Sequence, residues 1–134
     1  METNITNARI VGRDGIATGS LSIRDGVIAA IDGTGGDLPG ALDFEGDFLL
    51  PGLIEMHTDN LEKHFSPRPG VTWPSPKAAV IAHDLQVAGA GITTVFDAVS
   101  VGDYDSGGER RRMLADAVWA IGACVGQGLL RADH

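Results

Sequence analysis

A histidine and an aspartate two residues apart, His57 and Asp59, have the types and spacing of a metal-ligand pair. They lie where an apolar run ends in polar residues, at the carboxyl end of a predicted strand. Alternate residues of a strand point to the same face, so both side chains would lie together. An imidazole nitrogen and a carboxylate oxygen suit a divalent cation. A histidine hydrogen-bonded to a neighbouring aspartate would give the same pair, and both interpretations stay open here.

Basic side chains follow directly, in a chain whose formal net charge is −8. Lys63, His64 and Arg68 would suit phosphate recognition, since a guanidinium makes bidentate contacts and an ammonium acts as a point charge. Prolines on both sides of Arg68 restrict its backbone, as suits a positioned side chain. A solvated basic loop would explain the same residues. Glu62, in this stretch, is either a carboxylate that orients a ligand or a surface charge.

Two further aspartates follow the second predicted strand. Asp97 closes that strand and would either orient a ligand histidine or cap a helix. Asp103 lies six positions later in the sequence, and we expect it near the same end of the sheet. His83 lies within a predicted helix, where we expect a structural role. Cys124 lies on an apolar helix and is expected to fill the core.

Residues 1–50 alternate short apolar and polar stretches and predict a small β unit, β-sandwich-like, that serves as a folding module. Asp25 and Gly26 separate two alternating runs, which predicts a hairpin with a type I′ turn. A glycine-rich loop covers residues 33–40. The predicted strands are 7–11, 20–23, 27–31 and 41–48.

Residues 51–134 change to the strand–helix rhythm of a parallel sheet. A strand ends at His57, a helix over 76–89 has Ser75 as its N-cap and Pro76 in its first turn, and a strand over 92–96 is apolar enough to be covered on both faces. A second helix is predicted from about Gly108 to Gly126, and a third strand would start near His134. Two βα units do not close a barrel, so we expect a truncated chain; a complete, open α/β domain is the alternative.

Composition excludes several classes of protein. No apolar run approaches the roughly 20 residues that span a bilayer, and no apolar stretch of signal-peptide type follows Met1. We therefore expect a soluble protein, and the single cysteine favours the cytoplasm. The acidic balance argues against nucleic acid or an anionic membrane as partner. A homo-oligomer is compatible with these features.

The order of these features resembles the amidohydrolase superfamily. A small β unit precedes Pro51-Gly52-Leu53-Ile54-Glu55-Met56-His57-Thr58-Asp59, and that superfamily carries Pro-Gly and His-x-His here. The continuation Asp59-Asn60-Leu61-Glu62-Lys63-His64 is similar to the diphosphatases of phosphonate metabolism that act on ribose 1-methylphosphonate 5-triphosphate. Residues 91–98 extend the likeness, which covers essentially the whole chain. Asp59 stands where the broader family has its second histidine.

The resemblance implies the first βα units of an amidohydrolase (β/α)8 barrel, incomplete here, in a metal-dependent hydrolase that releases diphosphate from this ribose triphosphate. His57 and Asp59 would hold the divalent metal, which is zinc, manganese or magnesium, and Lys63, His64 and Arg68 would bind the phosphates. The family's remaining ligands and catalytic acid come from later strands, so the chain alone is expected to be inactive. The alternatives are an amidohydrolase that acts on C–N bonds and a non-catalytic interaction module.

Overall fold

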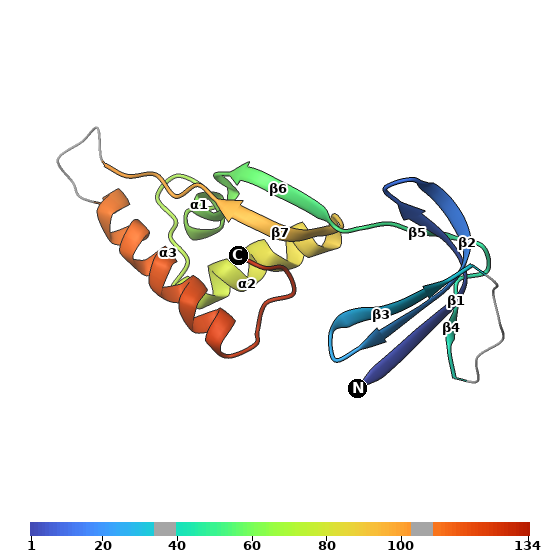
Figure 1. Ribbon diagram of the computed structural model, residues 1–134. Helices are drawn as coiled ribbons and strands as arrows, with labels where there is room; N and C mark the ends of the chain where they lie inside the picture. The colour runs from blue at the N-terminus through green and yellow to red at the C-terminus, as the bar shows by residue number, and fades with distance from the viewer. Residues whose placement is uncertain (34–39, 103–108) are drawn as a thin grey trace. The chain divides into compact units, whose positions relative to one another are not determined.

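The computed structural model describes residues 1–33, 40–102 and 109–134. They form two compact units, Met1–Pro51 and Gly52–His134, which Figure 1 shows in blue to green and in green to red. Asp103 and most of the glycine-rich stretch lie outside the described residues. In the part described, no helix is both long and apolar enough to cross a membrane.

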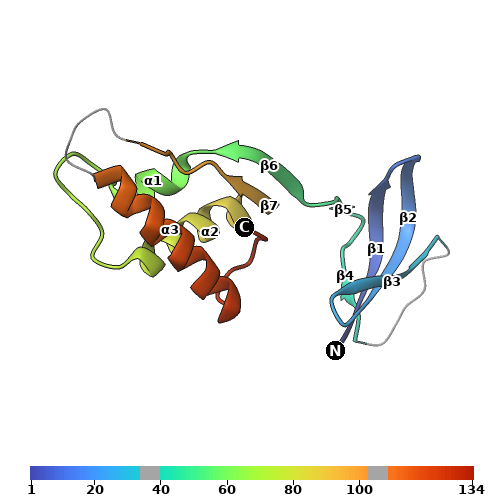
Figure 2. The same ribbon diagram turned by 60° about the vertical axis from the view of Figure 1, so that its left-hand side comes forward.

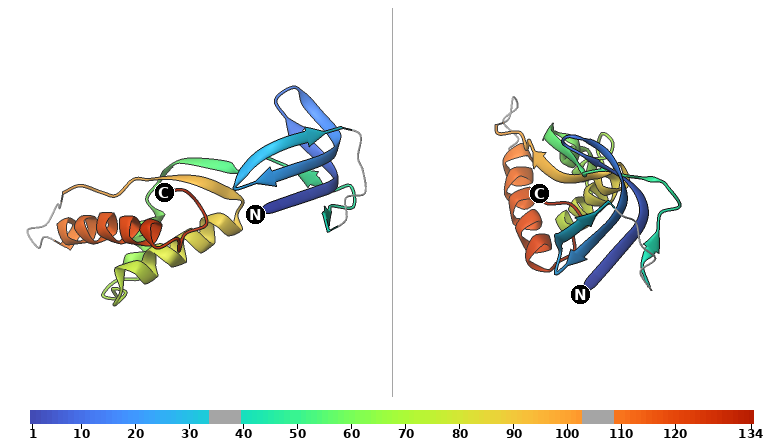
Figure 3. Two further views of the ribbon diagram at one scale, coloured as in Figure 1. Left: turned by 60° about the horizontal axis from the view of Figure 1, so that its bottom comes forward. Right: turned by 45° about the vertical axis from the view of Figure 1, so that its right-hand side comes forward.

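The first unit is a sheet built around the strand β1 (Glu2–Gly12). An antiparallel meander joins it to β2 (Gly15–Arg24) and β3 (Val27–Asp32), and the short β4 (Leu42–Asp43) and β5 (Phe48–Leu49) pair with β1 in parallel. Both views of Figure 3 show the meander as long curved strands. Ile5, Ala8, Ile10 and Leu21 form the buried core of this unit.

Local backbone preferences explain where these strands turn. Asp25 and Gly26 have φ of 53° and 80°, so the predicted hairpin has the positive φ at both central positions that a type I′ turn needs. The prediction of one strand over 41–48 is wrong, because β4 and β5 are separate. Glu45 and Gly46 lie between them with φ of 51° and 83°, and left-handed backbone of this kind ends a strand.

The second unit is a parallel strand pair with helices. The strands β6 (Leu53–Thr58) and β7 (Ile92–Asp97) pair in parallel, and α1 (Asn60–Phe65) and α2 (Pro76–Gly89) lie between them in sequence. α3 (Glu109–Gly126) follows β7. Figures 1 and 2 show the helices on one side of the two strands.

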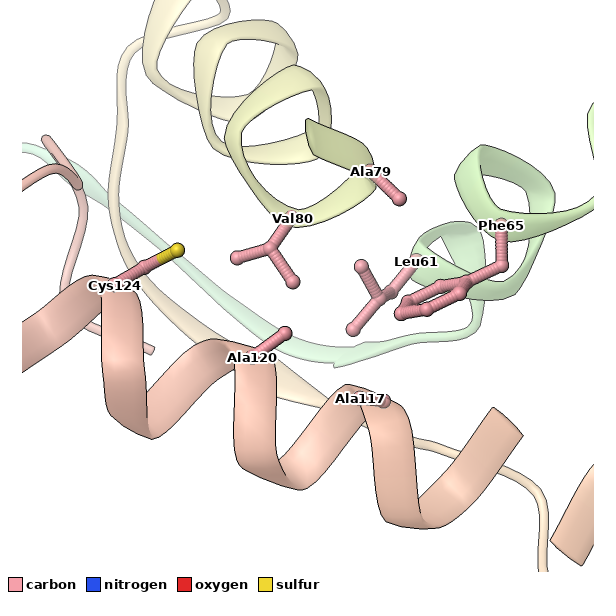
Figure 4. Close-up of a cluster of buried hydrophobic side chains, with 7 residues drawn as sticks. All are labelled: Leu61, Phe65, Ala79, Val80, Ala117, Ala120 and Cys124. Atoms are coloured by element: carbon pink, nitrogen blue, oxygen red, sulfur yellow. The ribbon is translucent and has the colours of Figure 1, made fainter. Parts of the chain in front are cut away.

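The helices pack on one another through small and aliphatic side chains. Figure 4 shows the buried cluster, in which α1 contributes Leu61 and Phe65, and α2 and α3 face them with small residues. Cys124 of α3 is fully buried there, as predicted. The helix predicted over 76–89 is confirmed, and Ser75 Oγ accepts a hydrogen bond from Ala78 N at 3.4 Å. The sequence patterns predict no helix over 60–65, and burial of Leu61 and Phe65 in this cluster stabilises the short helix α1.

A third parallel segment begins beside β7. Asp133 N donates to Thr93 O at 2.9 Å and Val95 N donates to Asp133 O at 2.7 Å, which makes an isolated parallel bridge near the place where a third strand is expected. The expectation that 92–96 is covered on both faces is not met among the described residues. Val95 is 3% exposed and Phe96 is 59% exposed, because the helices cover one face of the strand.

Candidate metal and phosphate site

The proposed ligand pair lies at the carboxyl end of β6. His57 and Asp59 are exposed, whereas Thr58 between them is buried. Thr58 pairs with Asp97 of β7, and its carbonyl oxygen accepts a hydrogen bond from Ala98 N at 2.8 Å. The two candidate ligands are therefore accessible, and their anchor is a buried threonine fixed to the neighbouring strand.

The helix α1 sets the positions of the nearest basic side chains. Lys63 Nζ donates to Asn60 Oδ1 at 2.8 Å and reaches Asp59 Oδ1 at 3.3 Å. His64 Nε2 lies 2.8 Å from Gln86 Oε1, so α2 holds its ring. Arg68 is exposed and forms an isolated antiparallel bridge with Val71. The structure thus places Lys63 beside Asp59 and ties His64 to α2.

Glu62 connects α1 to the segment after β7. Its Oε1 accepts a hydrogen bond from Ser100 N at 2.6 Å, and the residue is half-buried. A carboxylate in this position fixes the chain beyond the carboxyl end of β7 against α1. Glu62 therefore has a structural partner and is not a free surface charge.

Asp97 lies at the centre of a buried polar network. Its Oδ1 is 2.9 Å from His83 Nε2 of α2, and its Oδ2 is 2.8 Å from Nδ1 of His134. The side chains of His83 and His134 are fully buried and that of Asp97 is 6% exposed. Asp97 thus orients two histidines on the helix side of β7, and both of its oxygens are engaged there.

The network continues to Asp84, the residue after His83. Asp84 Oδ1 lies 3.4 Å from His134 Nε2. Both oxygens of Asp84 accept from Arg131 N, at 2.9 and 3.0 Å, and Ala132 N donates to Oδ1 at 2.8 Å. Asp84 therefore attaches α2 to the chain just before the third parallel segment.

The electrostatics of the network follow from burial and charge. Burial alone would raise the pKa of the Asp97 carboxyl, but hydrogen bonds from His134 and His83, with their charge, outweigh burial and lower this pKa to about 2. The hydrogen bond to Asp97 raises the pKa of His134 against the opposing effect of burial, and Asp84 adds to the rise. Among the described residues, His83 Nδ1 and His134 Nε2 are buried without a hydrogen-bond partner.

Sequence reasoning did not find His83, Asp84 and His134 as one group. A signal for two of them was present, because they interrupt the apolar stripe of the helix at Ala79, Val80 and Val87 with polar residues on the same face. Polar residues on a stripe that must be buried need partners. His134 had no such signal, because its place beside Asp97 depends on strand pairing.

Comparisons with known proteins show which proteins the chain is similar to. No family model matches the sequence. The chain is 45% identical over 130 residues to the Alpha-D-ribose 1-methylphosphonate 5-triphosphate diphosphatase of Escherichia coli (strain K12), a match over 97% of this chain and 34% of that protein. It is 34% identical over 97 residues to a D-hydantoinase of Rhizobium radiobacter, covering 72% of this chain and 20% of that protein.

Solved structures agree at the level of fold. A prolidase complexed with N-methylphosphonate-L-proline matches with a TM-score of 0.61 and 19% identity, over 99% of this chain and 30% of that chain. A D-hydantoinase matches with a TM-score of 0.54 and 25% identity, over 87% of this chain and 24% of that chain. The chain therefore has the α/β fold of a portion of these enzymes, as the sequence predicted.

The chain spans about a third of the length of the curated diphosphatase that it matches. By sequence, the chain is similar to that diphosphatase and to the D-hydantoinase, and its fold matches a portion of the solved prolidase and D-hydantoinase structures.

Proposed function

We propose that the chain is part of a metal-dependent hydrolase that releases diphosphate from alpha-D-ribose 1-methylphosphonate 5-triphosphate in phosphonate catabolism. The observation that carries the proposal is the 45% identity to the Escherichia coli diphosphatase over 97% of this chain. The accessible His57 and Asp59 at the carboxyl end of β6 support it, because active sites of parallel βα enzymes lie at that end.

His57 and Asp59 would hold the divalent cation. The donor set fits, since one imidazole and one carboxylate are exposed on either side of the buried Thr58, and a carboxylate suits manganese or magnesium as well as zinc. A bound cation would supply charge neutralisation at phosphoryl oxygens and a more acidic water. Lys63 Nζ lies 3.3 Å from Asp59 Oδ1, so a cation of the protein is already beside this carboxylate.

Lys63, His64 and Arg68 would bind the phosphates of the substrate. Lys63 and Arg68 are exposed cations close in sequence to the ligand pair, and the hydrogen bond to Gln86 directs the His64 ring. Glu62 would keep α1 beside the segment after β7 through its hydrogen bond from Ser100 N. Asp97 would fix the end of β7 to α2 through its contact with His83. The acid and the base of the reaction are not assigned to residues of this chain.

A chimeric enzyme tests the proposal. The matching third of the Escherichia coli diphosphatase is replaced by this chain, and release of diphosphate from the ribose triphosphate is measured. We expect turnover in the chimera and a loss of at least about a hundredfold with His57→Asn or Asp59→Asn, in the range of lost metal activation. Arg68→Ala should raise KM more than it lowers kcat. A folded chimera that loses no activity with either ligand variant contradicts the proposal.

A second candidate is hydrolysis of a cyclic amide. The identity of 34% to a D-hydantoinase favours it. That match covers 72% of this chain, less than the 97% covered by the match to the diphosphatase. To discriminate between the two functions, the protein that carries this chain is assayed in parallel with a ribose triphosphate and with a hydantoin. Release of diphosphate without ring opening supports the diphosphatase, and ring opening alone supports the second candidate.

A further inference from the structure

We propose that His83, Asp97 and His134 form a binding site for a divalent transition-metal cation, separate from the His57 and Asp59 pair. The three side chains come from α2, from the end of β7 and from the third parallel segment. One ligand atom from each lies within 4.8 Å of the others. Two histidines and one carboxylate are a recurrent donor set for such cations.

Each of the two histidines lies close to one carboxylate oxygen of Asp97. Asp97 Oδ1 is 2.9 Å from His83 Nε2, and Asp97 Oδ2 is 2.8 Å from His134 Nδ1. A cation would take the place of the protons that these atoms share in the metal-free molecule.

The surroundings of His134 favour bound metal. His134 Nε2 lies 3.4 Å from the Asp84 carboxylate, and this buried nitrogen has no hydrogen-bond partner in the part of the chain described. If Nδ1 binds a cation, the proton moves to Nε2 and faces that carboxylate. Metal-bound histidines commonly donate their other N–H to a carboxylate in this way.

This site lies apart from the one proposed for catalysis. Asp97 turns to the buried histidines on the helix side of β7, whereas His57 and Asp59 are exposed. A cation at His83, Asp97 and His134 would join α2, β7 and the third segment, and its expected effect is to stabilise the unit Gly52–His134.

The test uses the 134-residue chain, freed of metal by a chelator and titrated with Zn²⁺ in a calorimeter. We expect His83→Asn and His134→Asn each to weaken Zn²⁺ binding by at least about tenfold. The matched control Asp133→Asn, at an exposed carboxylate, should leave this binding unchanged. Zn²⁺ binding that is lost in His57→Asn and kept in His83→Asn overturns this proposal while supporting the catalytic pair.

A second measurement needs no variant, because a buried histidine variant can unfold. The ring nitrogens of the unmodified chain are followed by ¹⁵N NMR during the Zn²⁺ titration. We expect the ring-nitrogen signals of His83 and His134 to move into the metal-bound range in step with binding. Ring signals of both residues that stay unchanged at saturating Zn²⁺ mean a hydrogen-bonded network alone and overturn the proposal.

Discussion

Two carboxylates of this chain, those of Asp84 and Asp97, accept hydrogen bonds from different kinds of donor. Asp84 is 1% exposed and receives the backbone N–H groups of Arg131 and Ala132. Asp97 receives two imidazoles. Neither aspartate is a surface charge, although both stand in an acidic chain. Buried charges persist where several donors satisfy them, and here the donors come from distant parts of the sequence.

Asp84→Asn should therefore destabilise the second unit strongly. Hydrogen bonds to a charged acceptor contribute about 1.5–3 kcal/mol each, and the amide would turn an N–H group towards backbone donors. We expect a loss of about 3 kcal/mol in the free energy of unfolding, measured by urea denaturation with Trp73 and Trp119 as fluorescent probes. Asp133→Asn is the control, because Asp133 is exposed. Equal stability of both variants would contradict this role of Asp84.

At the scale of elements, the sheet of the first unit depends on a close approach between the backbones of β2 and β3. A Cβ at Gly19 of β2 would lie 2.0 Å from Asp32 O and 2.9 Å from Asp32 C, and backbone atoms of a paired strand cannot move away cheaply. A Cβ at Gly12 would meet Gly15 O at 3.7 Å, an ordinary contact. Two glycines of one sheet thus have different structural roles.

Gly19→Ala should destabilise the first unit by about 3 kcal/mol or more, since overpacking here cannot be relieved by a side-chain rotation. Gly12→Ala should change stability by less than about 1 kcal/mol. Amide hydrogen exchange of β1, β2 and β3 measures the effect. Both tryptophans lie in the second unit, so their fluorescence transition should stay in place. Unchanged exchange in Gly19→Ala would show that the strands can separate at no cost.

At the scale of the whole molecule, the β6–β7 pair leaves apolar side chains uncovered among the described residues. Leu53, Ile54, Met56 and Phe96 are 60%, 62%, 79% and 59% exposed. Exposed apolar surface of this kind favours association. We expect reversible self-association of the 134-residue chain in sedimentation velocity. Met56→Lys should reduce it, whereas Thr72→Lys, at an exposed polar position, should not. A monomer at every concentration tested would contradict the expectation.

The 134-residue chain by itself should not turn over the ribose triphosphate. Its exposed pair offers two ligands, whereas catalytic metal centres commonly use three protein ligands and an acid or base placed beside them. We expect rates well below about 1 per second, measured as diphosphate release with added Mn²⁺ or Zn²⁺. Turnover at rates typical of enzymes would show that the chain contains a complete centre.

The sequence by itself determined several of the elements, because their signals are local, whereas the helix α1 depends on tertiary burial of Leu61 and Phe65. The hairpin at Asp25-Gly26, the helix that starts after Ser75 and the strand that ends at Asp97 each follow from neighbouring residues. It also placed His57 and Asp59 at the end of a strand. The failure over 41–48 is local too, because left-handed backbone at Glu45 and Gly46 divides that stretch.

Only the tertiary structure decided which polar residues meet. Residues 83, 97 and 134 are far apart in sequence, and their contact depends on packing of α2 against β7 and on the parallel bridge at Asp133. No periodicity within one element encodes such a meeting, because it arises from burial that several elements share. The candidate ligand pair at the strand end, His57 and Asp59, was therefore visible in the sequence, and the buried histidine–aspartate network was not.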